Sequence, residues 1–215
     1  MNKTNILDQI SLLDKPYIIY RSKNGFTLYT NFSKKIILTK KNISSFLKKT
    51  DQKQKNLKKT DLYVGFFGYE ILNDLIKVKI PKQKETNFPK GIFYKPEEII
   101  NLSENLKYQP EKSSKIDTKF KINIDRKNYT KIFNKFKNKI KKGETYQIKI
   151  CTKYRNKSKI DPLDYFCRLT KTNLAPEAFL IKDKEYSIIS CSPETLIIKK
   201  GSSMSAKPIA GTLKK

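Results

Sequence analysis

The stretch DRKNYTKIFNKFKNKIKKGETYQIKICTKY, residues 125–154, decides the fold class because its hydrophobic period changes partway through. Its first half has an apolar side chain every three or four positions, which predicts a helix packed along one face. These positions are Tyr129, Ile132, Phe133, Phe136 and Ile140. Asp125 is the expected N-cap and Gly143 the expected end. From Tyr146 to Tyr154 apolar and polar side chains alternate, which predicts a strand.

Towards the N-terminus the sequence predicts mainly short strands. Residues 17–40 contain β-prone runs on both sides of a glycine turn signal. Residues 62–69 combine aromatic side chains with two glycines, which predicts a buried strand with a close backbone approach. The pattern of residues 42–60 predicts a surface helix followed by a loop. Residues 92–100 predict a strand that is broken by Pro96.

Towards the C-terminus, Pro162 is expected to open a second helix, and the runs 178–182, 186–191 and 195–199 predict further strands. No internal repeat is present. Residues 103–120 are polar and lack periodic apolar positions, so they are the expected linker. We therefore predict an N-terminal α+β domain over residues 1–122 and the start of a second domain over residues 123–215. The fold class is α+β, with mostly antiparallel sheets and packed helices.

The chain carries a net charge of +27 at pH 7, which by itself would favour a nucleic-acid partner. Recognition of bases and phosphates favours Arg over Lys. Only four of the 47 basic residues are Arg, namely Arg21, Arg126, Arg155 and Arg168. The lysines are also spread along the chain. We attribute the charge to the amino-acid drift of an AT-rich genome and expect no nucleic-acid partner.

Other features of the composition predict a cytoplasmic protein with no membrane partner. No run approaches the roughly 18–20 apolar residues that a membrane span needs, and the first twenty residues lack the pattern of a signal peptide. The cysteines Cys151, Cys167 and Cys191 show no metal-binding spacing and suit a reducing compartment.

The residues themselves offer few catalytic groups. The chain has no His, so the commonest general base is absent from this span. Phosphate loops, dinucleotide fingerprints and zinc-hydrolase motifs are absent from the sequence too. Glu97 and Glu98 lie in a polar run and are expected to be solvated. Cys191 lacks a His partner and is expected to be a buried thiol rather than a nucleophile.

Four short strings in the second half carry a family resemblance. They are Gly143-Glu144-Thr145-Tyr146-Gln147, Asn173-Leu174-Ala175-Pro176, Ser192-Pro193-Glu194 and Pro208-Ile209-Ala210-Gly211-Thr212. Each string alone has a structural reading as a turn or an element boundary. In this order and at these spacings they resemble the chorismate-binding enzyme family, most of all component I of anthranilate synthase. The string VGFFGYE, residues 64–70, is similar to the same large subunits. The resemblance implies the incomplete first part of the component I fold.

The resemblance implies a lyase of tryptophan biosynthesis. Ammonia adds to C2 of chorismate with loss of the C4 hydroxyl, and elimination of pyruvate then leaves anthranilate. Mg²⁺ is the implied cofactor, and a glutamine amidotransferase subunit is the implied partner that supplies ammonia. In such enzymes the catalytic residues and metal ligands lie downstream of the last string. We therefore expect neither in this span, and we expect the chain, as a fragment, to be inactive and poorly soluble alone.

The last string is implied to line the chorismate site. Gly211 and Thr212 are the substrate-binding candidates, because glycine lets the backbone approach a ligand and amide or hydroxyl groups bind a carboxylate. Ala210 completes this set. Many aminodeoxychorismate synthases are similar but have Lys at that position, as a nucleophile. Ala cannot attack the substrate, which favours direct attack by ammonia.

The resemblance also implies a regulatory tryptophan site between residues 19–22 and residues 173–178. The candidate residues are Ser22, Pro176, Glu177 and Ala178. Ser22 and Pro176 match the family pattern, whereas Glu177 and Ala178 replace Tyr and Met. Arg21 replaces an acid. These departures argue against inhibition by tryptophan.

Alternative functions remain open at this point. Aminodeoxychorismate synthase component I, of the folate branch, is the alternative within the family, because some of its members also resemble the Ala form. A basic RNA-binding module is the alternative from another class, but it needs exposed aromatics beside cations. The aromatics between residues 129 and 136 instead lie on the apolar stripe of the predicted helix, where core packing is expected. A non-enzymatic remnant of the fold is a third possibility.

Overall fold

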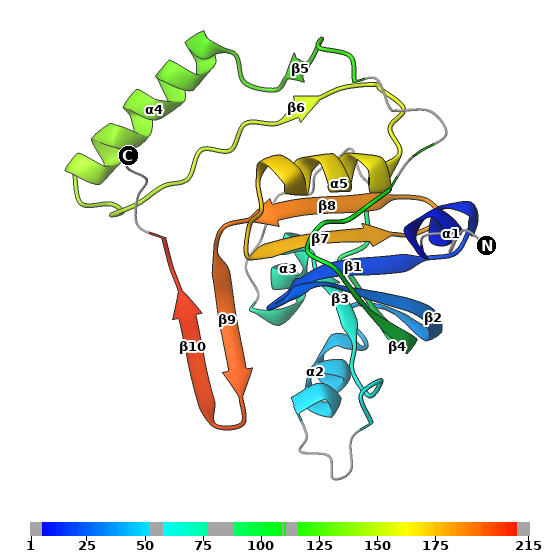
Figure 1. The fold of residues 1–215 in the computed structure, drawn as a ribbon. Helices are drawn as coiled ribbons and strands as arrows, with labels where there is room; N and C mark the ends of the chain where they lie inside the picture. The colour runs from blue at the N-terminus through cyan, green and yellow to red at the C-terminus, as the bar shows by residue number, and fades with distance from the viewer. Residues whose placement is uncertain (1–5, 52–57, 77–87, 109, 111–115, 210–215) are drawn as a thin grey trace. The chain divides into compact units, whose positions relative to one another are not determined.

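A computed structural model describes residues 6–51, 58–76, 88–108, 110 and 116–209 (Figure 1). The chain contains both helices and antiparallel strands, which confirms the predicted α+β class. The chain divides into two compact units, one of residues 1–111 with 162–215 and one of residues 112–161. The predicted domain boundary after residue 122 stays a prediction.

The first unit is built on a six-stranded antiparallel sheet in the order β3-β4-β2-β1-β7-β8. Its strands are β1 (Tyr17–Ser22), β2 (Gly25–Ile37), β3 (Val64–Phe67), β4 (Gly91–Leu102), β7 (Glu177–Lys182) and β8 (Ser187–Ser192). The predicted turn before Gly25 joins β1 to β2. β1 also pairs with β7, so segments from the two ends of the chain lie side by side in this sheet (Figure 1).

Alternate residues of the sheet point to different hydrophobic clusters. Ile19 packs with α1 (Ile6–Leu12) and α5 (Pro162–Thr172), whereas its neighbour Ile18 packs on the opposite side. α5 begins at Pro162 as predicted and lies against β7 and β8 (Figure 1). Phe166 of α5 meets Phe26 edge-to-face at 5.7 Å between ring centroids. This contact ties the helix to the middle of the sheet.

The third cluster lies around α2 (Ile43–Asp51), which buries Ile43 and Phe46 as the predicted surface helix should. A 3-10 turn η1 (Tyr69–Ile71) and the short α3 (Leu72–Leu75) follow β3. The predicted burial of this strand is wrong, because β3 is an edge strand whose residues are half-buried or exposed. The predicted close approach is confirmed. A Cβ on Gly65 would lie 1.9 Å from the carbonyl oxygen of Ile92.

The prediction that Pro96 breaks its strand is wrong. β4 runs continuously through Pro96, which stands opposite Phe32 of β2. The register shifts between Phe32 and Lys34, and Asn31 adopts a φ of 50° just before this irregularity. A bulge leaves ladder positions unpaired, so a residue without an N–H group is accommodated there.

The second unit contains α4 (Arg126–Lys141) and a short pair of strands, β5 (Lys121–Ile122) and β6 (Tyr154–Arg155). Both predicted ends of the helix are confirmed. The Asn128 amide donates to the Asp125 side chain at 2.8 Å, and Gly143 has a φ of 74°. The predicted packing of its apolar stripe is not seen, because no described residue of α4 is buried. Phe133 is 45 % exposed.

The predicted strand from Tyr146 to Tyr154 is also largely wrong. Only its last residue belongs to a strand, in β6. Residues 146–153 are in no strand, although the Asn123 amide donates to the Lys153 carbonyl oxygen at 3.1 Å and the Lys153 amide donates to Oδ1 of Asn123 at 2.6 Å. Alternating apolar and polar residues determine which side chains would face a core, but a strand also needs a neighbouring strand for its backbone hydrogen bonds. The predicted strand at 195–199 is confirmed as β9 (Thr195–Lys200) and forms a hairpin with β10 (Ser203–Lys207), which we did not predict.

Candidate functional site

The three candidate substrate-binding residues, Ala210, Gly211 and Thr212, lie outside the described residues. The other candidates meet at one end of the main sheet. β1 ends at Ser22 and β7 begins at Glu177, and Tyr20 stands opposite Phe179 in the register. We call this region the β1–β7 junction: Tyr20, Arg21, Ser22, Pro176, Glu177, Ala178, Ser192 and Thr195. Whether it binds tryptophan stays a prediction.

Two of the sequence strings come together at the junction. The segment Asn173–Pro176 is the connection from α5 to β7, and it turns through a hydrogen bond from the Asn173 amide to the Leu169 carbonyl oxygen at 2.8 Å. The string that begins at Ser192 is the turn from β8 to β9. Glu177 stands opposite Ser192 in the register, so both strings lie at the same end of β7.

Glu177 links three strands through its carboxylate. One oxygen accepts a hydrogen bond from the Tyr20 hydroxyl of β1, and the other accepts one from the Thr195 hydroxyl of β9. Burial, followed by the hydrogen bond and the charge of Glu177, raises the pKa of Tyr20 above its ordinary value. The carboxylate is therefore already engaged within the protein. Tyr20 and Thr195 were missed by the sequence reasoning, because only their contact with Glu177 marks them.

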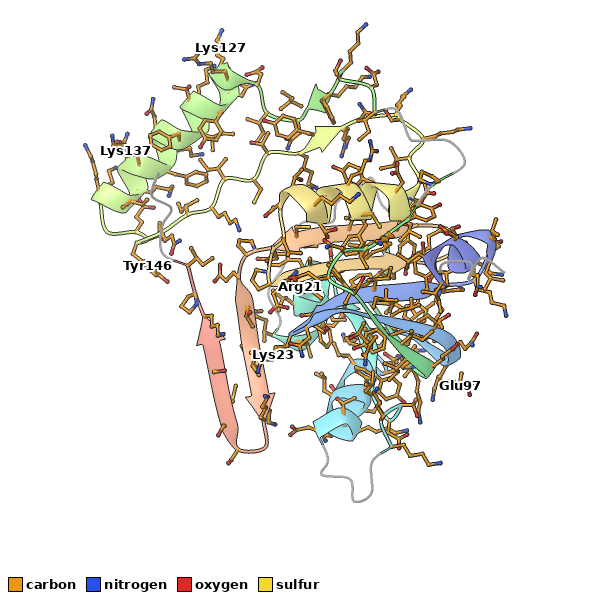
Figure 2. All side chains as sticks on the ribbon, viewed as in Figure 1. Arg21, Lys23, Glu97, Lys127, Lys137 and Tyr146 are labelled. Atoms are coloured by element: carbon orange, nitrogen blue, oxygen red, sulfur yellow. The ribbon has the colours of Figure 1, made fainter. Side chains whose placement is uncertain are left out.

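Arg21 brings a positive charge to the junction (Figure 2). Its Nη2 atom lies 3.0 Å from Oε1 of Glu104, and the guanidinium carbon lies 5.9 Å from the centre of the Phe26 ring. Its Nη1 atom is buried and has no hydrogen-bond partner among the described residues. A guanidinium with a spare donor favours a carboxylate or phosphate over an ammonium group.

The remaining junction residues contribute less. Ala178 is completely buried in the cluster that contains Phe26, so its side chain has no accessible surface. Pro176 is exposed and Ser22 is half-buried. Cys191 of β8 is half-buried rather than fully buried, and burial raises the pKa of its thiol. A protonated thiol is a poor nucleophile, which agrees with the structural role predicted for Cys191.

Within the described ranges, no group of three or more His, Cys, Asp or Glu side chains could hold a metal ion. Glu97 and Glu98 are exposed, as predicted, and Glu98 accepts a hydrogen bond from Asn31 at 2.7 Å (Figure 2 labels Glu97). The described residues therefore supply no ligand cluster for magnesium. Also among the described residues, no helix has the length and apolar character to cross a membrane.

The α4 surface bears on the RNA-binding alternative. Tyr129 and Phe133 stack on each other at 6.4 Å, and Lys137 lies 5.9 Å from the Phe133 ring (Figure 2). The two rings are thus partly exposed. The expectation that they pack in a core, which argued against an RNA-binding module, is wrong. Aromatics flanked by lysines are compatible with base stacking. The comparisons with known proteins point elsewhere.

The sequence pattern of the chorismate binding enzyme family matches residues 15–215. Anthranilate synthase component 1 of Buchnera aphidicola subsp. Pemphigus spyrothecae is 27 % identical over 200 residues, which cover 76 % of this chain and 38 % of that protein. Anthranilate synthase component 1 of Archaeoglobus fulgidus is 32 % identical over 90 residues, covering 42 % of this chain and 22 % of that protein.

Aminodeoxychorismate synthase component 1 of Escherichia coli (strain K12) is similar too, with 24 % identity over 110 residues, covering 51 % of this chain and 24 % of that protein. The chain thus spans less than two fifths of the length of each of these three relatives.

Proposed function

The chain belongs to the chorismate-binding enzyme family, and from this premise we propose that it is part of an anthranilate synthase large subunit. The proposed reaction converts chorismate and ammonia to anthranilate and pyruvate. The observation that carries the proposal is the similarity to an anthranilate synthase component 1, which covers 76 % of the chain. The activity, the substrates and the partners of the whole protein are all part of this proposal.

The identity of residue 210 supports the anthranilate route. Ala210 has no nucleophilic group, so its side chain cannot attack C2 of chorismate covalently. Ammonia then attacks C2 itself, and the C4 hydroxyl leaves as water. Loss of the C2 proton and of pyruvate restores the aromatic ring. Gly211 and Thr212 are the proposed contacts of the substrate.

The ammonia comes, in this proposal, from glutamine through an amidotransferase subunit. Mg²⁺ stays part of the proposal as well, although the described residues hold no cluster of ligands that fits it. The three cysteines are free thiols, which supports a reducing cytoplasmic location.

The β1–β7 junction does not favour a tryptophan ligand. A free amino acid needs an acceptor for its ammonium group, and Arg21 offers only donors. The carboxylate of Glu177 is engaged by Tyr20 and Thr195. We therefore propose that tryptophan does not regulate the enzyme through this region.

Aminodeoxychorismate synthase is the second candidate, favoured by the similarity to the Escherichia coli component 1 over 51 % of the chain. The two candidates share the amination of chorismate and differ in whether pyruvate is released at the same site. The product therefore discriminates between them directly.

The complete gene product, purified with its amidotransferase subunit and supplied with chorismate, glutamine and Mg²⁺, should produce anthranilate and pyruvate in equal amounts. Anthranilate is followed by its fluorescence and pyruvate by a coupled dehydrogenase. Replacing glutamine by ammonium salts at high pH should retain the activity without the partner. Aminodeoxychorismate without pyruvate would move the protein to the second candidate, and unchanged chorismate would contradict both.

A further inference from the structure

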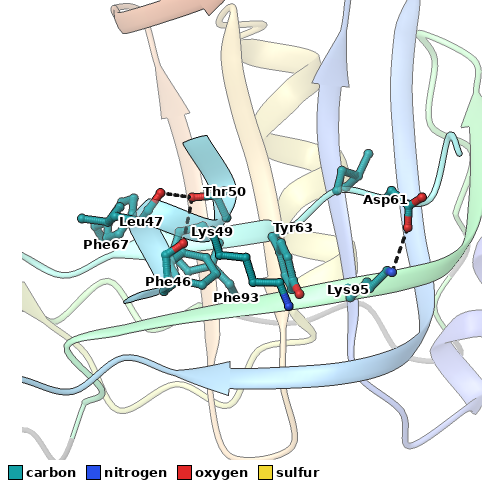
Figure 3. Close-up of a pocket in the computed structure, with 10 residues that line it drawn as sticks. Phe46, Leu47, Lys49, Thr50, Asp61, Tyr63, Phe67, Phe93 and Lys95 are labelled. Atoms are coloured by element: carbon teal, nitrogen blue, oxygen red, sulfur yellow. Dashed lines mark hydrogen bonds and ion pairs between the residues drawn. The ribbon is translucent and has the colours of Figure 1, made fainter. Parts of the chain in front are cut away.

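A pocket of about 660 Å³ lies between α2, β4 and the segment that leads into β3 (Figure 3). All of its lining residues belong to the first unit. It shares no residue with the β1–β7 junction. Its volume falls in the range of roughly 300–1,000 Å³ that is typical of small-molecule sites.

The wall of the pocket is a continuous group of aromatic rings. Phe93 lies at the centre, with Phe46 at 4.9 Å and Phe67 at 4.7 Å between ring centroids. Tyr63 meets Phe46 edge-to-face at 5.5 Å. Phe46 is buried, but Phe67 is 51 % exposed, so part of this aromatic surface is open to a ligand. Such a wall favours a flat ring that can stack on it.

The charges around the wall do not cancel. Lys95 is paired with Asp61 at 2.9 Å, and the other oxygen of Asp61 accepts the Lys58 amide at 3.0 Å. The hydrogen bond from Lys95 lowers the pKa of Asp61, so this carboxylate is ionised and offsets Lys95. Lys49 lines the same pocket, is exposed, and has no acidic partner among the described residues. The described lining residues of the pocket therefore carry one uncompensated positive charge.

We propose that this pocket binds a small aromatic carboxylate, with the ring against Phe67 and Phe93 and the carboxylate near Lys49. The Thr50 hydroxyl, which also lines the pocket, does not donate a hydrogen bond to the ligand, because it donates to carbonyl oxygens of its own helix at 3.0 Å. The inference stands on the pocket alone and does not depend on the proposed enzymatic function.

The probe for this site is 2-naphthoate, titrated into the 215-residue chain. The chain has no Trp, so the fluorescence of the naphthalene ring is observed without overlap from indole. Lys49→Gln should weaken binding about threefold to fivefold, as loss of one exposed ion pair does. Phe67→Ala should weaken it about fivefold to tenfold, as loss of a stacked ring does. The neutral 2-naphthamide should bind to the native chain as weakly as 2-naphthoate binds to the Lys49→Gln variant.

Matched controls exist for both changes. Lys48→Gln removes the neighbouring exposed lysine of α2, which does not line this pocket, and Tyr69→Ala removes a ring that is 70 % exposed outside it. Both should leave binding unchanged, and thermal melts should show that every variant used in the test folds. Equal binding of the acid and the amide would overturn the proposal. It would also be overturned if Phe133→Ala on α4 weakened binding more than Phe67→Ala, because the probe would then sit on another apolar surface.

Discussion

Replacing Leu163 by Ala should lower the free energy of unfolding by about 3 kcal/mol. Leu163 is completely buried and belongs to the cluster that joins α1 and α5 to the main sheet. The truncation removes apolar contact and leaves a cavity, because neighbouring rings such as Phe166 are held by their own packing. Urea titration followed by tyrosine fluorescence and circular dichroism measures the change.

The control for this prediction is Leu196→Ala in β9, which makes the same chemical change in the same unit. Leu196 is 79 % exposed, so its truncation should change the free energy of unfolding by less than about 0.5 kcal/mol. Equal effects at the two positions would contradict the core described here. A loss at Leu196 that exceeds the loss at Leu163 would mean that the hairpin, rather than α5, is the packed element.

Replacing Asp183 by Asn should lower the free energy of unfolding by about 3 kcal/mol at neutral pH. Asp183 is 3 % exposed and lies just after β7. Its carboxylate lies 2.6 Å from Nζ of Lys35 and accepts the Tyr94 hydroxyl and, at 2.6 Å, the Lys184 amide. The neutral amide cannot pair with Lys35 and leaves the buried hydroxyl of Tyr94 with a weaker acceptor.

This effect should depend on pH in a defined direction. Burial alone would raise the pKa of Asp183, but the hydrogen bonds from Lys35, Tyr94 and the Lys184 amide outweigh it and lower the pKa. A carboxyl whose pKa is lower in the folded state contributes its full stabilisation above its unfolded pKa of about 3.9, and that contribution is lost progressively as the pH falls from there through the lower folded pKa. The difference in stability between the native chain and the Asp183→Asn variant should therefore begin to narrow as the pH falls below about 4.

The control is Asp14→Asn, at an exposed position before β1, which should change the stability by less than about 0.5 kcal/mol. Urea titrations between pH 7 and pH 3 compare the three proteins. A difference between the native chain and Asp183→Asn that stays constant over this range would show that the ionised carboxylate is not the source of the stability.

Local chemistry made several elements predictable. The helix α4 begins at Asp125 because its side chain accepts the Asn128 amide, and it ends near Gly143 because glycine tolerates a positive φ. α5 begins at Pro162, a residue suited to the first helical turn. Each of these features depends on residues within a few positions of one another, so the sequence contains all the information.

The candidate site was predictable only in part. The resemblance of its strings pointed to residues 19–22 and 173–178, and the pairing of β1 with β7 brings these segments together. The sequence resemblance could not reveal that the Glu177 carboxylate accepts hydrogen bonds from Tyr20 and Thr195, or that Ala178 is buried. Nor could it reveal the aromatic pocket. Its walls come from three separate elements, and no residue spacing marks them.

The sequence by itself determined the fold class, the caps of the long helix and the family, because periodicity, capping and motif spacing depend on residues that are close together in the sequence. The tertiary structure alone decided which strands find partners, which faces are covered and which charges are paired. Residues 146–153 alternate like a strand yet belong to no strand of the described structure, while Pro96 lies within a continuous strand. The reason is that a ladder hydrogen bond, a buried face and an ion pair each need a second group, and that group comes from a distant part of the chain.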